Sequence, residues 1–246
     1  MENFNDQFTK PKHNIFLYVV VIVVVLGVGY LGVSVYRATQ QKSSDILASL
    51  SDKYINELSV DSSGVGAGNA QADVETEDDP FIGSRDGRVH IVEFGDFECP
   101  FCSQEVAVIQ QLEARYGNQI FMQFRNFPIV TLHPNAYNAA LAAECAYAQG
   151  NEKFWQYHDR LYQFQDSLSD DLYFSLAQRT GLDVDAFTTC YNQKTPADEV
   201  EQDYLDGVDL GVTGTPTFFI NGHRVPGAIS FDMFQKVIDQ LLEKSS

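Results

Sequence analysis

The chain has 246 residues, with 16 Lys and Arg against 34 Asp and Glu, which gives a net charge of −18. This balance repels phosphate backbones and leaves no basic surface of the kind that nucleic-acid binding requires, so nucleic acid is excluded as a partner. The hydrophobic share of 44% is ordinary for a globular chain and excludes disorder over the whole length. Of the 4 cysteines, two form a C-x-x-C pair.

An apolar segment without charge lies near the N-terminus. Residues 15–36 are mostly Val, Ile, Leu and Gly, and a helix of that length, at about 1.5 Å per residue, crosses the roughly 30 Å core of a bilayer. Tyr36 and Arg37 follow, where a cleavable signal peptide would have small residues. The sequence therefore predicts a short tail over 1–14 and an uncleaved, single-pass signal anchor over 15–36.

Residues 37–80 are predicted to form a juxtamembrane helix and an acidic flexible linker. Apolar residues recur at helical spacing between Asp45 and Val60. This helix either is solvated on its own or pairs with a second copy. Residues 61–79 mix Gly, Ser and Ala with acidic side chains and contain little that packs into a core, which is typical of a self-repelling tether.

The remaining stretch, 81–246, has the length of one domain. Residues 89–94 are predicted to form a buried strand, the cysteine pair follows, apolar residues recur at helical spacing as far as Tyr116, and residues 120–124 alternate as a strand does. Such a β-α-β unit is right-handed by default. The sequence thus indicates an α/β fold.

A long helical stretch and a hairpin complete the predicted domain. Residues 134–211 carry helical patterns throughout, with an acidic run from Asp198 to Asp203 that is typical of a solvated face. Asn221-Gly222 between two short apolar runs predicts a type I′ hairpin. A final helix follows, with Ser230 as a plausible N-cap.

The C-x-x-C pair stands where the first strand ends and the first helix begins. Pro100 suits the first helical position, so Cys99 lies at the helix N-terminus, where unpaired amides and the helix dipole favour a thiolate. We therefore expect Cys99 to be the nucleophile. Cys102 lies one turn further on the same face and is the expected resolving thiol.

Two other interpretations of this pair stay open at this point. The pair would form half of a zinc site, although Cys145 and Cys190 are too far apart in sequence to form a second knuckle. It would otherwise be a structural disulfide, although closing so short a loop constrains the unfolded chain little.

Three separated motifs together resemble the DsbA-like branch of the thioredoxin superfamily. They are the run from Glu93 to Cys102, the segment Phe124-Arg125-Asn126-Phe127-Pro128, and the run from Val212 to Phe218. The resemblance covers about 81–246 and implies a thioredoxin-like fold with an inserted helical subdomain at about 134–211. The anchor and the linker would precede this domain.

The resemblance also implies roles for individual residues. In that family the peptide bond matching Thr215-Pro216 is cis, and its loop packs against the cysteines and pairs with bound peptide. Glu93 matches a buried acid that relays protons to the resolving thiol, the alternative being an ordinary carboxylate facing water. The strongest oxidases have histidine at the position of Phe101, so we expect a milder disulfide donor here.

All four cysteines follow the anchor, so one orientation places every thiol on the same, oxidising side of the membrane. Cys145 and Cys190 are then expected to form a structural disulfide, with two buried free thiols as the alternative. The expected location is a bacterial cell membrane, with the N-terminus in the cytoplasm and the catalytic domain outside.

The expected function is a thiol-disulfide oxidoreductase that forms disulfides in reduced or unfolded exported proteins. Its redox-active disulfide, Cys99–Cys102, serves in place of a cofactor, and no metal is expected. A membrane partner would reoxidise it. The alternatives are a reductase, a disulfide isomerase that dimerises through the juxtamembrane helix, and a non-catalytic chaperone or metal-relay module.

Overall fold

The structure, a computed structural model, describes Ser34, Arg37 and residues 74–244. The predicted tail at 1–14, the anchor at 15–36 apart from Ser34, and the juxtamembrane helix lie outside these residues. Among the residues that are described, no helix is both long and apolar enough to cross a membrane.

The described domain is built on a five-stranded mixed sheet with the order β1-β3-β2-β4-β5. Strands β2 and β3 are parallel, and the other neighbouring pairs are antiparallel. The strands are β1 (Phe81–Gly83), β2 (Val89–Gly95), β3 (Ile120–Asn126), β4 (Thr217–Ile220) and β5 (His223–Pro226). Because β2 and β3 are parallel, their carboxyl ends meet at one edge of the sheet.

Strands β2 and β3 are buried along nearly their whole length, although each also carries buried polar residues, such as Glu93 in β2 and Gln123 in β3. Helices α2 (Pro100–Tyr116) and α8 (Phe231–Lys244) pack on one face of the sheet. The hairpin contains Asn221 at φ 47° and Gly222 at φ 77°, the positive angles that a type I′ turn needs. Strand β1 has only three residues, too few to give a periodic signal in the sequence.

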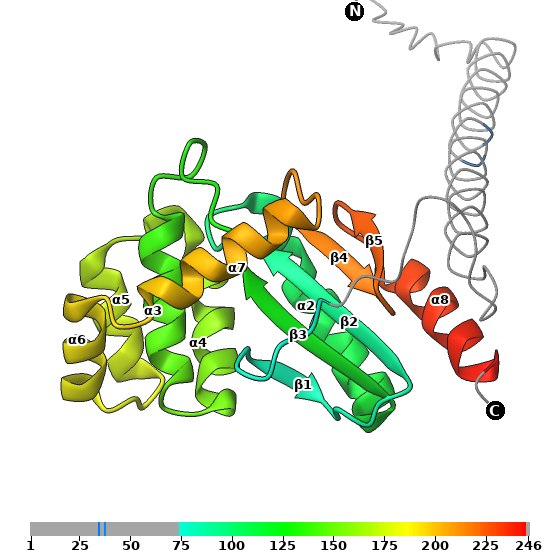
Figure 1. The fold of residues 1–246 in the computed structure, drawn as a ribbon, viewed down its shortest axis with the longest axis horizontal. Coiled ribbons are helices and arrows are strands. Elements are labelled where there is room, and N and C mark those ends of the chain that lie inside the picture. Colours follow the sequence, from blue (N-terminus) through cyan, green and yellow to red (C-terminus); the bar gives the residue numbers. More distant parts are fainter. Residues whose placement is uncertain (1–33, 35–36, 38–73, 245–246) are drawn as a thin grey trace, which may run out of the picture. The chain divides into compact units, whose positions relative to one another are not determined.

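Five helices fill the stretch between β3 and β4. Figure 1 shows α3 to α6 gathered beside the sheet and α7 running back across it. These helices are α3 (Ala136–Tyr147), α4 (Asn151–Gln163), α5 (Asp170–Arg179), α6 (Val184–Gln193) and α7 (Ala197–Asp209). A disulfide between Cys145 and Cys190 joins α3 to α6, with the Cα atoms 5.8 Å apart.

The prediction of a flexible linker up to residue 80 is wrong for its last residues, because residues 74–79 pack on the sheet face opposite α2. Val74 and Asp79 are buried. Asp79 pairs with the buried Arg125 of β3, with 3.1 Å between Oδ2 and Nε. A buried guanidinium needs such partners, and sequence periodicity does not reveal them.

The prediction that the acidic run of α7 faces solvent is also wrong at one position. Asp203 is fully buried, and its Oδ1 lies 2.7 Å from Nε of Arg125. Its Oδ2 accepts a hydrogen bond from the backbone N–H of Asn126 at 2.8 Å. Asp206 lies one turn further and pairs with Nη2 of Arg125 at 2.6 Å. The acidic run therefore turns one side inward to hold the end of β3.

Candidate active site

The C-x-x-C pair lies just beyond the carboxyl end of the central strand β2. The chain leaves β2 at Gly95, and Cys99 forms the N-cap of α2 with extended backbone angles, φ −75° and ψ 121°. Pro100 occupies the first turn, where an N–H is not needed. The amides of the next residues therefore face the sulfur of Cys99. This is the position that the sequence predicted.

Two acidic side chains fix the loop between β2 and α2. The buried Asp96 accepts hydrogen bonds from the N–H of Ile129 and from Nδ1 of His133, both at 2.8 Å. Glu98 accepts one from the N–H of Asn135 at 2.6 Å. The segment after β3 is thus tied to the segment after β2, next to the cysteine pair.

Gln165 is a site residue that sequence reasoning missed. It lies in the short 3-10 helix η2 (Gln165–Ser167), within the helical insertion. Its Nε2 donates to the carbonyl oxygens of Phe97 at 2.9 Å and Cys99 at 2.8 Å. The insertion therefore takes part in shaping the catalytic loop. No local sequence signal marks this contact, because 66 residues separate Gln165 from Cys99.

The two thiols differ strongly in acidity. A hydrogen bond from Cys102 lowers the pKa of Cys99 to about 5, against the effect of burial, and Thr215 and the backbone N–H groups of Cys102 and Phe101 act in the same direction. Burial raises the pKa of Cys102 well above its ordinary value, and the bond to Cys99 and the charge of Glu93 raise it further. At neutral pH the favoured state is a Cys99 thiolate beside a Cys102 thiol.

Glu93 and Glu105 lie between the sheet and α2. Glu93 is buried, and its Oε2 has no hydrogen-bond partner among the described residues. Burial raises the pKa of Glu93 well above its ordinary value, and Glu105 and Cys99 add to this effect. Burial also raises the pKa of Glu105 to about 7, although its Oε1 accepts from the N–H of Ile229. Glu93 is thus not a carboxylate facing water, and sequence reasoning missed Glu105.

The loop before β4 faces the first cysteine. The sulfur of Cys99 lies 3.2 Å from the carbonyl oxygen of Thr215 and donates a hydrogen bond to it when protonated. The Thr215-Pro216 peptide bond is cis, as the resemblance implied. The hydroxyl of Thr217 donates to the carbonyl of Gly214 at 2.7 Å and closes the loop on itself.

Exposed apolar side chains lie on the segments that flank the pair. Phe101 is 58% exposed, and Val130 and Leu132, on the segment tied to Asp96, are 55% and 72% exposed. Large exposed apolar side chains that gather on one surface are typical of a binding site.

Among the described residues, no further metal ligand groups with the cysteine pair, as the zinc interpretation would require. Cys145 and Cys190 are joined to each other. In the part of the chain that the structure describes, the only group of carboxyl, imidazole or thiol ligands with metal-binding spacing is Asp78, Asp79 and Glu199, which excludes the pair.

Comparison with protein families and curated proteins gives consistent matches. The family model described as thioredoxin matches residues 75–240. This chain is 36% identical to the Na(+)/H(+) antiporter NhaA 3 of Salinispora tropica over 166 residues. The alignment covers 67% of this chain and 25% of that protein. NhaA 1 of Mycolicibacterium vanbaalenii is 35% identical over 63% of this chain and 25% of its own length. The chain therefore spans about a quarter of these relatives.

Solved structures give the same fold. The thiol-disulfide exchange protein α-DsbA2 from Wolbachia pipientis is 27% identical with a TM-score of 0.61, over 66% of this chain and 87% of that one. A thioredoxin-like oxidoreductase from Silicibacter pomeroyi is 26% identical with a TM-score of 0.60, over 68% and 94%. Oxidised BdbD from Bacillus subtilis, at 23% identity, has the same fold with a TM-score of 0.63 over 71% and 98%. The domain has an α/β fold with a mixed sheet, and this fold is the DsbA-like fold of thiol-disulfide oxidoreductases. The chain therefore belongs to the thioredoxin family.

Proposed function

We propose that this chain is a membrane-tethered thiol-disulfide oxidoreductase that forms disulfides in reduced or unfolded exported proteins. The observation that carries the proposal is the difference in acidity between the two thiols, with the pKa of Cys99 lowered to about 5 and that of Cys102 raised. A thiolate that is stabilised only in the reduced state makes reduction of the Cys99–Cys102 disulfide favourable. The oxidised protein then acts as a disulfide donor.

The exchange proceeds in two steps. A substrate thiolate attacks the sulfur of Cys99, which forms a substrate–Cys99 bond and expels Cys102 as a thiolate that takes up a proton. A second substrate thiolate attacks the substrate sulfur of this mixed disulfide and expels the Cys99 thiolate, which is a good leaving group because its pKa is low. The substrate loses two electrons, and the cysteine pair gains them.

Glu93 is the proposed proton donor to Cys102. The raised pKa of Glu93 favours its protonated carboxyl. When Glu93 is ionised, its negative charge raises the pKa of Cys102. A proton supplied inside the core stabilises the departing thiolate where water is excluded. Glu105, with a pKa of about 7, lies in the same layer and is the proposed route by which Glu93 exchanges protons.

The surroundings of Cys99 suit an extended polypeptide. The backbone beside cis-Pro216 faces the thiol, and the exposed side chains of Phe101, Val130 and Leu132 offer apolar contacts. Pairing of backbone groups with apolar contacts is a recurring mode of peptide recognition that needs little sequence specificity. It suits a varied set of reduced, exported proteins as substrates.

The membrane tether is proposed from the sequence. Residues 15–36 form an uncharged apolar run of bilayer length. With the N-terminus in the cytoplasm, every cysteine lies on the outer side of a bacterial cell membrane, where disulfides persist. The reduced pair then requires an oxidant, and a membrane protein that accepts electrons from thiols is the proposed partner.

The test is a single turnover of the oxidised full-length protein with a reduced dithiol peptide. A glutathione buffer is chosen so that the peptide stays reduced when no protein is added. Stoichiometric oxidised protein is then expected to convert the peptide to its disulfide. An enzyme that only reduces disulfides, or only reshuffles mispaired ones, would refute the oxidase proposal in favour of the reductase or isomerase alternative. A protein that neither oxidises, nor reduces, nor reshuffles disulfides would leave the chaperone or metal-relay alternative.

A further inference from the structure

The hydroxyl of Tyr162 reaches the end of β2, in the same core cluster as the cysteine pair. Tyr162 belongs to α4, and its side chain is buried with Cys99 and Cys102. A Cβ placed on Gly95 would lie 3.3 Å from the hydroxyl oxygen of Tyr162. Gly95 is the last residue of β2 and follows Glu93 by two positions. Since residues two apart in a strand point to the same face of a sheet, this hydroxyl lies on the face to which Glu93 points.

Two buried polar atoms on this face have no hydrogen-bond partner among the described residues. They are the hydroxyl oxygen of Tyr162 and Oε2 of Glu93. The residues are 6% and 1% exposed, so bulk water does not reach these atoms. A buried polar group without a partner is unfavourable. A phenol donates a hydrogen bond and a carboxylate oxygen accepts one, so the two groups are complementary.

The charged groups that act on Glu93 are acidic. They are Glu105 and Cys99, which are negative when ionised. The other titratable side chains around Glu93 and Tyr162 are Cys102 of α2, Asp96 of the loop after β2, and His158 of α4, whose ring packs on that of Tyr162. Burial lowers the pKa of His158, so its ring is neutral at pH 7. The buried residues of α8, which packs on the same face, are Phe234, Val237 and Ile238.

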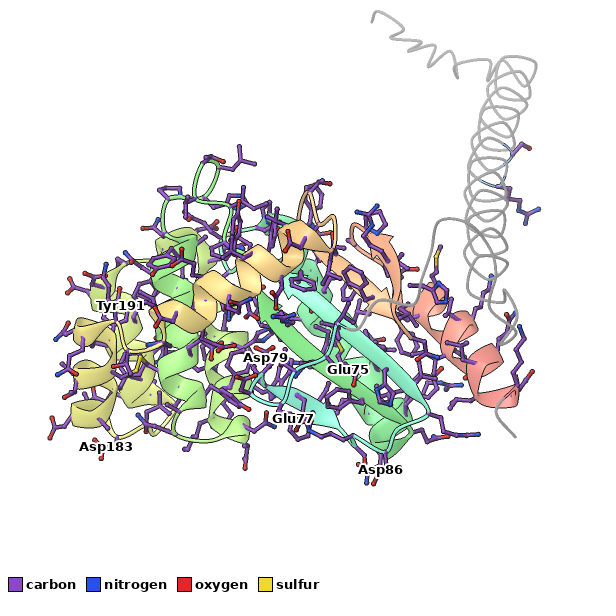
Figure 2. All side chains as sticks on the ribbon, viewed as in Figure 1. Glu75, Glu77, Asp79, Asp86, Asp183 and Tyr191 are labelled. Atoms are coloured by element: carbon purple, nitrogen blue, oxygen red, sulfur yellow. A yellow bond between two sulfur atoms is a disulfide. The ribbon has the colours of Figure 1, made fainter. Side chains whose placement is uncertain are left out.

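Arg125, a cation of the neighbouring strand, serves the opposite face of the sheet. In the register of β2 and β3 it lies beside Phe94, whose side chain alternates with that of Glu93. Its guanidinium pairs there with Asp79, which is labelled in Figure 2. The groups around the Glu93 carboxylate therefore leave it with neutral donors. Burial raises the pKa of Tyr162 well above its ordinary value, so its hydroxyl stays a donor while Glu93 titrates.

We propose that Tyr162 is a positioning residue for proton transfer from Glu93 to Cys102, and that its hydroxyl donates a hydrogen bond to Oε2 of Glu93, directly or through one bridging water. This inference rests on the proposed exchange reaction. When Cys102 leaves as a thiolate, one proton moves from the Glu93 carboxyl to its sulfur, and Glu93 becomes a buried carboxylate. The hydroxyl keeps its own proton and stabilises that carboxylate, because hydrogen bonds to charged groups are strong where water is excluded.

The first test is a titration of the Glu93 carboxyl in the oxidised full-length protein, solubilised in detergent and labelled with ¹³C at the glutamate carboxyl groups. The signal of Glu93 is identified by its absence in Glu93→Gln. Tyr162→Phe is expected to make the Glu93 carboxyl about tenfold weaker as an acid, because its charged form loses a donor. The active-site thiols are joined in the oxidised protein, so this measurement does not depend on exchange.

The second test is the rate of the first exchange step, measured against pH by stopped-flow mixing of the oxidised protein with a reduced peptide. The rate should fall as Glu93 loses its proton. Tyr162→Phe should slow the step severalfold and move this fall to higher pH, since the pKa of Glu93 rises in the variant.

Tyr157→Phe is the matched control for both tests. Tyr157 is buried on the same helix, and its hydroxyl donates to the carbonyl oxygen of Tyr173 at 2.9 Å. The control should unfold at a lower denaturant concentration, because it loses this hydrogen bond. The acidity of Glu93 and the pH dependence of exchange should stay as in the wild type.

Unchanged acidity of Glu93 in Tyr162→Phe would overturn the proposal, and so would an equal change in Tyr157→Phe. A changed acidity with an unchanged pH profile of exchange would also overturn it, because Tyr162 would then have no part in the proton transfer. If the wild-type protein exchanges no disulfides, the proposed function and the kinetic role of Tyr162 both fail, whereas the titration still decides whether the hydrogen bond exists.

A measurement on the tyrosine keeps the proposal testable if Tyr162→Phe fails to fold. In wild-type protein labelled with ¹³C at the tyrosine Cζ atoms, one ring signal should follow the titration of Glu93 and should stay fixed in Glu93→Gln. Absence of such a signal would refute the contact between the two side chains.

Discussion

The thiol of Cys99 and the carbonyl oxygen of Thr215 lie 3.2 Å apart, although 116 residues separate them in the chain. Cys99 is the N-cap of α2, which follows β2, and Thr215 lies in the loop before β4, the neighbour of β2 in the sheet. This contact places the reactive sulfur against backbone that a bound peptide could reach.

The two cysteines are expected to behave differently when replaced singly. Cys99→Ser should abolish disulfide exchange, because it removes the thiolate with the lowered pKa. In Cys102→Ala, the Cys99 thiolate should attack an oxidised substrate disulfide, expel one substrate thiolate and accumulate as a long-lived mixed disulfide, since no internal thiol remains to release it. Non-reducing electrophoresis and mass spectrometry of the trapped complex measure this. Normal turnover by Cys102→Ala, or faster alkylation of Cys102 than of Cys99 at neutral pH, would contradict the assigned roles.

The reduced protein is expected to gain stability over the oxidised one as the pH rises. The pKa of Cys99 is lowered from 9.0 to about 5 in the folded state, so its stabilising effect is fully present above about pH 9 and is lost as the pH falls through 5. The thiolate absorbance at 240 nm should titrate near pH 5 and disappear in Cys99→Ser. Denaturant unfolding of both redox forms at several pH values measures the difference. A more stable oxidised form at pH 7 would refute the donor assignment.

The disulfide between Cys145 and Cys190 is expected to support the fold and not the chemistry. It closes a loop with a sequence separation of 45, which corresponds to at most about 4 kcal/mol in the loop-entropy model. The double variant Cys145→Ser and Cys190→Ser should therefore unfold at lower denaturant concentration but still exchange disulfides. Loss of exchange under conditions where the variant remains folded would show that the bond also shapes the active site.

Glu93→Gln is expected to slow exchange while leaving the fold intact, because glutamine matches the shape of glutamate and carries no ionisable proton. The first step, in which Cys102 leaves, should slow about a hundredfold. Stopped-flow mixing of the oxidised protein with a reduced peptide at several pH values measures this step. Glu113→Gln, on the exposed side of α2, is the control. An unchanged rate over the whole pH range would exclude Glu93 from the proton transfer.

Replacing Arg125 is expected to be strongly destabilising. Its guanidinium is 3% exposed and pairs with Asp79, Asp203 and Asp206. Arg125→Gln leaves these carboxyls without their cation, at a cost of about 3–5 kcal/mol. Arg115→Gln removes an exposed pair with Asp239 at 3.9 Å and a contact with the Tyr116 ring, and should leave the free energy of unfolding nearly unchanged. Similar losses in both variants would mean that the buried network contributes little.

The sequence alone determined the elements around the cysteine pair. A short apolar run marked β2, alternating residues marked β3, proline marked the first turn of α2, and Asn221-Gly222 marked the hairpin. These signals are local, because periodicity, capping and turn propensity act over a few neighbouring residues. The C-x-x-C spacing and the helix start together pointed to thiol chemistry in the same local way.

Only the tertiary structure decided which distant side chains meet. Gln165 binds the backbone of Cys99, Asp96 binds the segment after β3, and Asp203 turns inward from an acidic run to pair with Arg125. Each contact joins residues far apart in sequence, so no local pattern contains it. A buried charge and a solvated charge also look alike in a sequence, since burial depends on what the rest of the chain packs around them. For that reason, the sequence alone did not reveal that residues 74–79, whose composition is typical of a linker, belong to the folded domain.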